Sequence, residues 1–184
     1  LVRGRASLVL GDIPAAQADF SQALEISARK KFCTLAIQAH IELGNLLSYR
    51  NAWSLAEEEY RAALPLLAGN LIYTAAVEGG LAKALLEQRK LDEAFSHADS
   101  AASVLLTHPL LTQYDVVGTL LRTFNVLCTA QDARHRPLLQ RGLEYLLDRS
   151  EKITEEEMRR AFLENIPAHK FLLELAKEHR IGVP

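Results

Sequence analysis

A pattern of small residues that recurs along the chain constrains the fold more than any other feature of the sequence. One set of spaced small residues returns after 40 residues and again after a further 38. The members of the three copies are Gly4, Ala16 and Ala23, then Gly44, Ala56 and Ala63, then Ala82, Ala94 and Ala101. Small side chains at helical spacing let two antiparallel helices approach closely at their crossing points. The pattern therefore predicts tandem helix pairs, with Phe20 and Tyr60 filling the gap beside the first two crossings.

Composition and local signals favour helices along the whole chain. The 184 residues include 33 Leu and 26 Ala but only 9 Gly and 6 Pro. No segment alternates with a period of two for long enough to predict a strand. Capping residues and breakers divide the chain into a partial helix ending near residue 10 and helices at about 13–29, 31–49, 53–67, 70–88, 91–106, 110–130, 136–150, 154–165 and 168–180. Thr154, followed by Glu157 three residues later, predicts a capping box.

The repeated unit resembles the tetratricopeptide repeat, a helix–turn–helix unit of about 34 residues. In the second copy the matching residues are Leu43-Gly44, Leu47, Asn51-Ala52-Trp53, Ala56, Tyr60 and Ala63, and in the third they are Leu81-Ala82, Leu85, Lys90-Leu91-Asp92, Ala94 and Ala101. The resemblance implies a right-handed α-α superhelix of about four helix pairs over residues 1–150. The first copy matches from Gly4 onward, so we expect the sequence to open inside a repeat of a longer polypeptide.

The last part of the sequence carries a second resemblance. Ile153-Thr154, the stretch from Met158 to His169 and then Leu172-Leu173 resemble the closing segment of long bacterial tetratricopeptide proteins. Those proteins typically carry an ATPase of the STAND or AAA-like kind, so the resemblance implies the C-terminal arm of a larger signalling or regulatory protein. We expect residues 151–184 to form a helical hairpin that caps the last repeat. Its apolar residues are Phe162, Leu163, Ile166, Phe171, Leu172 and Leu175.

The charge balance argues against two large classes of partner. The chain has 21 Lys and Arg against 23 Asp and Glu, a formal net charge of −2, which gives no general attraction to nucleic acid or to acidic membranes. The longest stretch without a charged residue, from Ala62 to Val77, is too short to span a bilayer. Cys33 and Cys128 each have apolar neighbours and are expected to be buried free thiols. We therefore expect a cytoplasmic protein that binds neither nucleic acid nor membranes.

The sequence holds no pattern that predicts catalysis, a metal ion or a cofactor. The six histidines are His40, His97, His108, His135, His169 and His179, and no two are three or four residues apart, as two ligands on one helical face would be. There is no CxxC pair and no glycine-rich phosphate-binding loop. His169 is expected to bond to backbone at a helical break or to face solvent. We therefore expect a protein that is not an enzyme.

Tetratricopeptide arrays usually bind a peptide or protein segment in the concave groove lined by the first helix of each unit. Placing the copies in phase puts Arg5, Asn45 and Lys83 at one equivalent position, with Arg122 extending the row in a fourth unit. All four are hydrogen-bond donors to carboxylate or carbonyl oxygens. The candidate groove residues are Arg5, Gln38, Asn45, Ser48, Tyr49, Lys83, Glu87 and Arg122. Gly79-Gly80 indicates either close helix packing or room for a ligand beside the groove.

The expected function is therefore an interaction or sensing module that binds a protein or peptide, with its own upstream ATPase or effector domain as one such partner. Three alternatives stay open. The groove could be the receptor site for a small-molecule inducer, as in related arrays of regulatory ATPases. The chain could self-assemble, for example as a homodimer. The groove residues could also be exposed polar side chains without any partner.

Overall fold

The computed structural model of the chain describes residues 1–109 and 115–182, and within these ranges it contains helices and no strand. The prediction of an all-α fold is thus confirmed for the described residues. The helices are α1 (Val2–Val9), α2 (Ile13–Lys30), α3 (Cys33–Tyr49), α4 (Trp53–Ala63), the 3₁₀ turn η1 (Leu64–Leu66), α5 (Leu71–Glu87), α6 (Leu91–Thr107), α7 (Val116–Thr129), α8 (His135–Glu151), α9 (Glu156–Glu164) and α10 (Pro167–Glu178).

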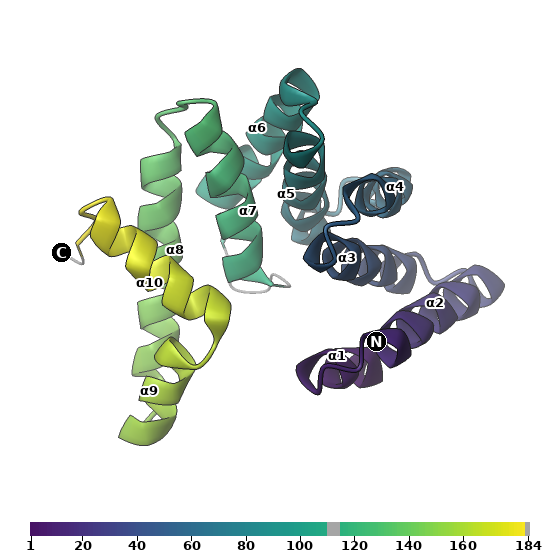
Figure 1. Cartoon of the computed structure of the whole chain (residues 1–184), viewed down its shortest axis with the longest axis horizontal. Helices are drawn as coiled ribbons and strands as arrows, with labels where there is room; N and C mark the ends of the chain where they lie inside the picture. The colour runs from purple at the N-terminus through teal and green to yellow at the C-terminus, as the bar shows by residue number, and fades with distance from the viewer. Residues whose placement is uncertain (110–114, 183–184) are drawn as a thin grey trace.

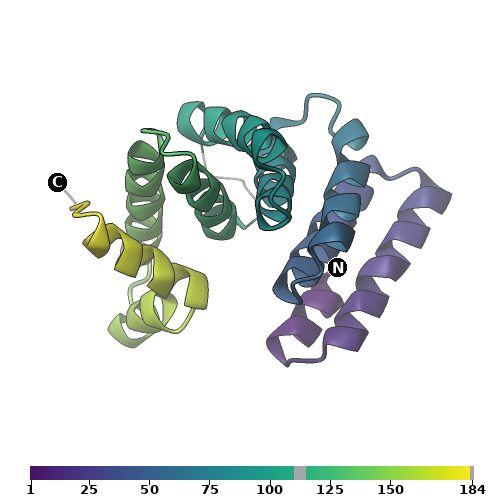
Figure 2. The same cartoon turned by 45° about the horizontal axis from the view of Figure 1, so that its top comes forward.

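The helices pack in chain order, each against the next (Figure 1). Contacts also link α3 with α5 and α5 with α7, and on the other side α6 with α8. The pair α1 and α2 lies at one end of the molecule and the pair α9 and α10 at the other (Figure 2). One large core cluster extends from α3 to α10, and a second, smaller cluster lies at the N-terminal end around Phe20 and Leu46.

Four turns between paired helices share one geometry. Gly11, Asn51, Arg89 and Gln131 all have a positive φ, between 54° and 78°. In every case the next backbone N–H donates to the carbonyl five residues earlier, as in Ala52 to Leu47 at 2.9 Å. This is the hydrogen bond of the Schellman motif, which ends the first helix and turns the chain back. The turns are 40, 38 and 42 residues apart, so the repeat that the sequence indicates is present in the backbone and extends to a fourth unit.

The small residues of the repeat lie directly against large ones. The ring of Tyr60 on α4 lies between Gly44 of α3 and Gly80 of α5. A Cβ added at Gly44 would lie 2.7 Å from the Tyr60 ring, and one added at Gly4 would lie 2.5 Å from the ring of Phe20. The sequence pattern predicts that Phe20 and Tyr60 lie beside the helix crossings. In the structure each ring instead occupies the position that a side chain at the glycine would take. The Gly79-Gly80 pair therefore serves close packing, one of the two roles that the sequence left open.

Polar contacts between helices also follow the repeat. His40 Nδ1 on α3 lies 2.7 Å from Glu59 Oε2 on α4. Thirty-eight residues later, Glu78 Oε2 on α5 lies 2.5 Å from His97 Nδ1 on α6, so the same two positions carry the same two residue types in opposite order. Arg50 donates to Gln17 at 3.3 Å and its equivalent Gln88 donates to Glu57 at 2.7 Å. Each of these last two bonds ties the end of one unit's first helix to the preceding unit's second helix.

Three local expectations differ from the structure. The predicted helix 53–67 ends at Ala63 and continues as the 3₁₀ turn, because Pro65 lacks the N–H needed to extend the α-helical bonding. Thr154 does not cap α9, since the helix begins one residue later than a capping box requires and its N-cap, Glu155, makes no side-chain cap bond. Cys33 is exposed and Cys128 half-buried, so the expectation of two buried thiols is wrong. The start of the predicted helix 110–130 falls partly outside the described residues, and α7 begins at 116.

The C-terminal hairpin covers part of the last helix pair. Helix α10 packs on α7 and α8, and Leu172 is 1% exposed against them. The side chain of His169 joins the two short helices, because its Nδ1 lies 2.8 Å from the carbonyl oxygen of Phe162. This is the backbone contact at the helical break that the sequence predicted. Phe171 is 50% exposed and Ile166 39% exposed, so these two of the six predicted cap residues do not take part in the buried contact.

Gly44→Ala tests the contact between glycine and tyrosine. The added methyl group would overlap the Tyr60 ring, so we expect a loss of about 1–3 kcal/mol in unfolding free energy. That loss should appear although alanine favours helices by about 1 kcal/mol over glycine. Urea denaturation followed by circular dichroism measures it. Gly182→Ala, where nothing lies within 4 Å, is the matched control and should change stability little. Equal stability of the two variants would contradict the packing.

A charge swap tests the paired polar positions. His40→Glu and Glu59→His should each lower unfolding free energy by about 1 kcal/mol, because each places like residues opposite one another. The double variant recreates the order seen in Glu78 and His97 and should recover most of the loss. Denaturation at neutral pH measures all three. Lys152→Glu, in an exposed pair with Asp148, is the control and should cost less than either single change. A double variant no more stable than the singles would contradict the equivalence.

Candidate functional site

Residues from three helices that are distant in sequence meet on one side of the molecule. A pocket of about 240 Å³ is lined by Arg5 of α1, Glu42 and Asn45 of α3, and Asp115 at the start of α7. Arg122, about two turns into α7, bonds to Asp115 from the same side. We call these five residues the concave polar cluster. The helices α1, α3 and α7 contribute to it, and these are three of the helices on which the groove prediction placed its residues.

Two ion pairs organise the concave polar cluster. Arg5 Nε donates to Glu42 Oε1 at 2.7 Å and links α1 with α3. Arg122 Nη2 donates to Asp115 Oδ2 at 3.0 Å and to Thr119 Oγ1 at 3.2 Å. The cluster therefore alternates positive and negative groups, and its formal charge is close to zero. A ligand that binds here meets fixed hydrogen-bonding groups of both signs.

Glu42 is the most deeply buried charged side chain of the cluster. Its side chain is 8% exposed, although it lies on a helix whose neighbouring residues form the apolar core. Burial raises the pKa of the Glu42 carboxyl above its ordinary value, and the positive charges of Arg5 and Arg122 offset this only in part. A carboxyl in this state accepts a proton at a higher pH than an exposed glutamate does.

Arg122 is largely enclosed as well, with its side chain 19% exposed. Burial by itself would lower the pKa of the Arg122 guanidinium, but the charge and hydrogen bond of Asp115 together with Tyr60 and Glu42 outweigh it, so the pKa is raised and the group stays charged. Its Nε is buried and has no hydrogen-bond partner among the described residues. A buried donor left without a partner is costly, and it is the kind of group that a ligand acceptor satisfies.

Repeat positions explain how these charges come together. Glu42 on α3, Gly80 on α5 and Arg122 on α7 occupy equivalent places, 38 and 42 residues apart as the turns are. Gly80 has no side chain, and the Tyr60 ring fills the space in front of it. The Tyr60 hydroxyl donates to Asn45 Oδ1 at 2.8 Å, and no described group accepts from the Asn45 amide nitrogen. Because Gly80 has no side chain, α5 leaves room for the Tyr60 ring and for the charged side chains of Glu42 on α3 and Arg122 on α7.

The structure brings together some of the predicted groove residues. Arg5 and Asn45 line one pocket, and Arg122 belongs to the same cluster. Lys83 does not join them, because its ammonium pairs with Glu87 and donates to Asn125 Oδ1 at 2.9 Å. The predicted continuous row of donors is therefore interrupted at the third unit.

The remaining predicted residues have separate roles. Gln38 donates from Nε2 to the Tyr73 hydroxyl at 2.8 Å, joining α3 to α5. Ser48 donates to the carbonyl of Gly44 on its own helix at 2.8 Å. Tyr49 is 78% exposed at the end of α3. Glu87 is also exposed, and its carboxylate pairs with the ammonium of Lys83. These four residues do not line the pocket of the concave polar cluster.

Sequence reasoning missed Glu42, Asp115 and the Tyr60 hydroxyl. The register of the fourth unit was also wrong, because the equivalent of Lys83 is Asn125 and Arg122 lies one turn earlier, in the column of Glu42. The turn at Gln131 could have fixed that register, since it places the fourth unit 42 residues after the third. A charged Glu42 between Ile41 and Leu43, both core residues, was a further signal in the sequence.

The described residues offer neither a metal site nor a membrane-crossing helix, and none of the known proteins compared with the chain matches it. Among the described residues no group of three His, Cys, Asp or Glu side chains is placed to hold a metal ion. No helix in the described ranges is long and apolar enough to cross a membrane. Comparisons with protein-family models, curated proteins and solved structures return no match to this chain.

The pKa shifts of two buried glutamates predict opposite pH dependence. Burial raises the pKa of Glu42, so the folded state is stabilised relative to the unfolded state below pH 4.5 and loses that stability as pH rises through the folded pKa. For Glu57 burial alone would raise the pKa, but hydrogen bonds from Lys90, Arg61 and Gln88 outweigh it and the pKa is lowered. Its stabilisation is present above pH 4.5 and is lost as pH falls.

Glu42→Gln and Glu57→Gln therefore form a matched pair. Relative to the unchanged chain, Glu42→Gln should gain stability as pH rises from 4 to 7, and Glu57→Gln should lose it over the same range. Urea denaturation at both pH values measures the two differences. If the stability of both variants changed in the same direction with pH, burial would not be the dominant influence on the pKa of Glu42.

Proposed function

We propose that the chain is a non-enzymatic interaction module whose helix pairs form a tetratricopeptide-like superhelix and whose concave side binds an extended peptide or protein segment. The shared turns at 40, 38 and 42 residues and the repeated contacts between units support the superhelical arrangement. The resemblance of the closing segment to bacterial tetratricopeptide proteins supports a role as the arm of a larger signalling or regulatory protein.

The observation that carries the binding proposal is the concave polar cluster. Glu42 and Arg122 are charged groups held in a mostly enclosed position, where they cost the fold more than apolar residues would. Perturbed, partly enclosed charges of this kind gather at functional sites. The unpartnered Nε of Arg122 and the amide nitrogen of Asn45 are donors suited to backbone carbonyl oxygens of a bound segment.

The size of the pocket favours a segment over a small-molecule inducer. Its volume of about 240 Å³ is below the range of about 300–1,000 Å³ that encloses most small ligands. A peptide needs only to place one or two backbone or side-chain groups in such a pocket while the rest of it lies along the helices. A peptide or protein segment is therefore the proposed ligand of the groove, in preference to a small-molecule inducer.

Selection from a random peptide library on the immobilised chain, followed by calorimetry with a synthetic selected peptide, tests the proposal. Arg122→Gln should weaken that peptide about tenfold or more, because it removes the buried charged donor. Arg89→Gln is the matched control, since glutamine already occupies the equivalent turn position at Gln131, and it should leave affinity unchanged. Lys83→Ala should also have little effect, since Lys83 is bonded within the protein.

The fold of each variant is checked by its denaturation midpoint before binding is compared. A peptide that binds the Arg122→Gln chain as tightly as the unchanged chain would place the binding surface outside the concave polar cluster. A library that yields no peptide above background, with the chain shown to be folded, would likewise overturn the proposal.

A further inference from the structure

A second hollow lies at the turn between α2 and α3, apart from the concave polar cluster. Its volume is about 570 Å³, within the range of about 300–1,000 Å³ typical of ligand pockets. Apolar side chains from α2, from the start of α3 and from η1 form most of its wall, including Leu24, Ala28, Phe32 and Leu66. An apolar surface of this size that remains open to water is a candidate docking site.

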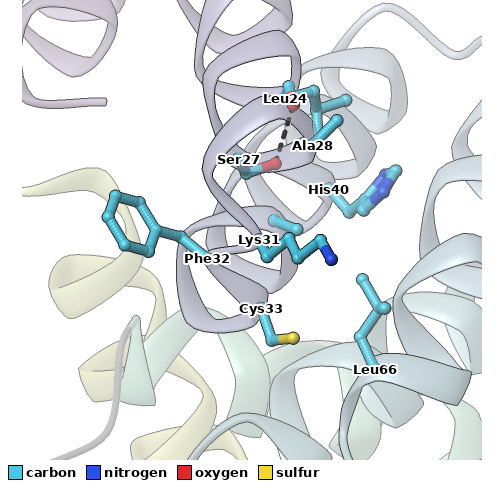
Figure 3. Close-up of a pocket in the computed structure, with 9 residues that line it drawn as sticks. Leu24, Ser27, Ala28, Lys31, Phe32, Cys33, His40 and Leu66 are labelled. Atoms are coloured by element: carbon cyan, nitrogen blue, oxygen red, sulfur yellow. Dashed lines mark hydrogen bonds between the residues drawn. The ribbon is translucent and has the colours of Figure 1, made fainter.

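The polar groups in the wall are mostly bonded within the protein. Ser27 donates its hydroxyl to the carbonyl of Leu24 at 2.7 Å, and His40 is held by Glu59. Lys31 is the exception, since no described residue forms an ion pair with it. In Figure 3 its side chain extends between Cys33 and His40 toward Leu66, so the ammonium group faces the hollow.

The end of α2 beside the hollow carries an excess of positive charge, which we call the cationic rim, and of its three cations Lys31 lines the hollow itself. Arg29, Lys30 and Lys31 follow one another at the end of α2, and all three are exposed. The next helix, α3, begins here without an acidic residue in its first turn. Glu25, one turn before Arg29, is the acidic residue of the same helix end. The surface thus combines an apolar hollow with a cationic rim.

Another hollow, of about 480 Å³, lies on the other side of the same turn. It shares Lys31, Phe32 and Cys33 with the hollow of about 570 Å³. Phe32 lines both hollows and is 56% exposed, and in Figure 3 its ring points away from the other side chains of the first hollow. An elongated occupant can therefore contact both hollows across the turn, whereas a compact ligand would use one only. This arrangement favours a segment of polypeptide as the occupant.

From these observations we propose that the α2–α3 turn is a docking site for an acidic peptide segment that inserts one large apolar side chain into the hollow. The apolar side chain displaces water from the wall formed by Leu24, Ala28 and Leu66. Carboxylates on either side of it pair with Lys30 and Lys31, neither of which forms an ion pair with a described residue. This site is independent of the proposed groove function and uses none of the residues of the concave polar cluster.

A defined probe makes the proposal testable without knowledge of the natural partner. The probe is a fluorescein-labelled peptide of alternating Asp and Glu residues with one central Phe. One control peptide has Ala in place of Phe, and another has Lys in place of every acidic residue. Fluorescence anisotropy at low salt should show the acidic Phe peptide binding about tenfold tighter than either control.

Two variants locate the contacts. Lys30→Gln with Lys31→Gln should weaken the probe about tenfold, and Ala28→Trp should block it by filling the hollow from an exposed position. Lys170→Gln with Lys177→Gln removes the same charge from α10 and should leave affinity unchanged. Should Ala28→Trp alter the fold, the lysine pair still decides the outcome.

Cys33 supplies a readout confined to the hollow. In a Cys128→Ala background it is the only thiol of the chain, and it is exposed. Saturating acidic Phe peptide should slow its reaction with Ellman's reagent about fivefold or more, and the lysine peptide should not.

Three results would overturn the proposal. Anisotropy that saturates without protecting Cys33 would mean that the probe binds elsewhere. Equal affinity for the acidic and the lysine peptide would remove the role of the cationic rim. A concentration-dependent dimer that Ala28→Trp abolishes, seen by light scattering, would make a second copy of this chain the occupant.

Discussion

The contact of Tyr60 with two glycines determines how closely the central helices pack. Its ring fills the positions where side chains at Gly44 and Gly80 would lie, so α3, α4 and α5 meet around one buried aromatic residue. The hydroxyl at the end of the ring donates to Asn45 and so connects the apolar core to the concave polar cluster. The position of Glu42 therefore depends on a contact between apolar atoms, because the ring fixes the spacing of α3 and α5, and α5 in turn packs on α7, which carries Arg122.

The units share the pairs of positions that contact one another more than they share the residues at those positions. The histidine and the glutamate that join α3 to α4 exchange places between α5 and α6, and the pairing of Gln17 with Arg50 becomes Glu57 with Gln88. In each case the two positions face one another because the turns have the same geometry. Complementary residues at facing positions satisfy the interaction in either order. Such exchanges weaken the similarity of residues between units while the contacts persist.

The two candidate surfaces differ in the physics that makes them. The inner side places charges of both signs in a partly enclosed position, where their interactions are strong and where Glu42 is held against its preference to ionise in water. The α2–α3 turn combines an open apolar wall with exposed cations, whose attraction depends on salt. The two proposed sites would therefore differ in mechanism, one using precise hydrogen bonding and the other an apolar anchor. The near-zero net charge conceals this difference, because it averages over both.

The sequence by itself determined the class of fold, the helix pairs and the places of their turns, because small residues at a constant spacing and helix-breaking residues act locally. It also predicted Arg5, Asn45 and Arg122 as groove residues, and the structure places these three in one cluster. It did not determine that Lys83 is bonded to Glu87 and Asn125, that Glu42 is buried beside Arg5, or that Cys33 is exposed. Those outcomes depend on which helices approach one another and at what distance. The close packing around Tyr60 and Gly80 decides that distance, and only the tertiary structure contains it.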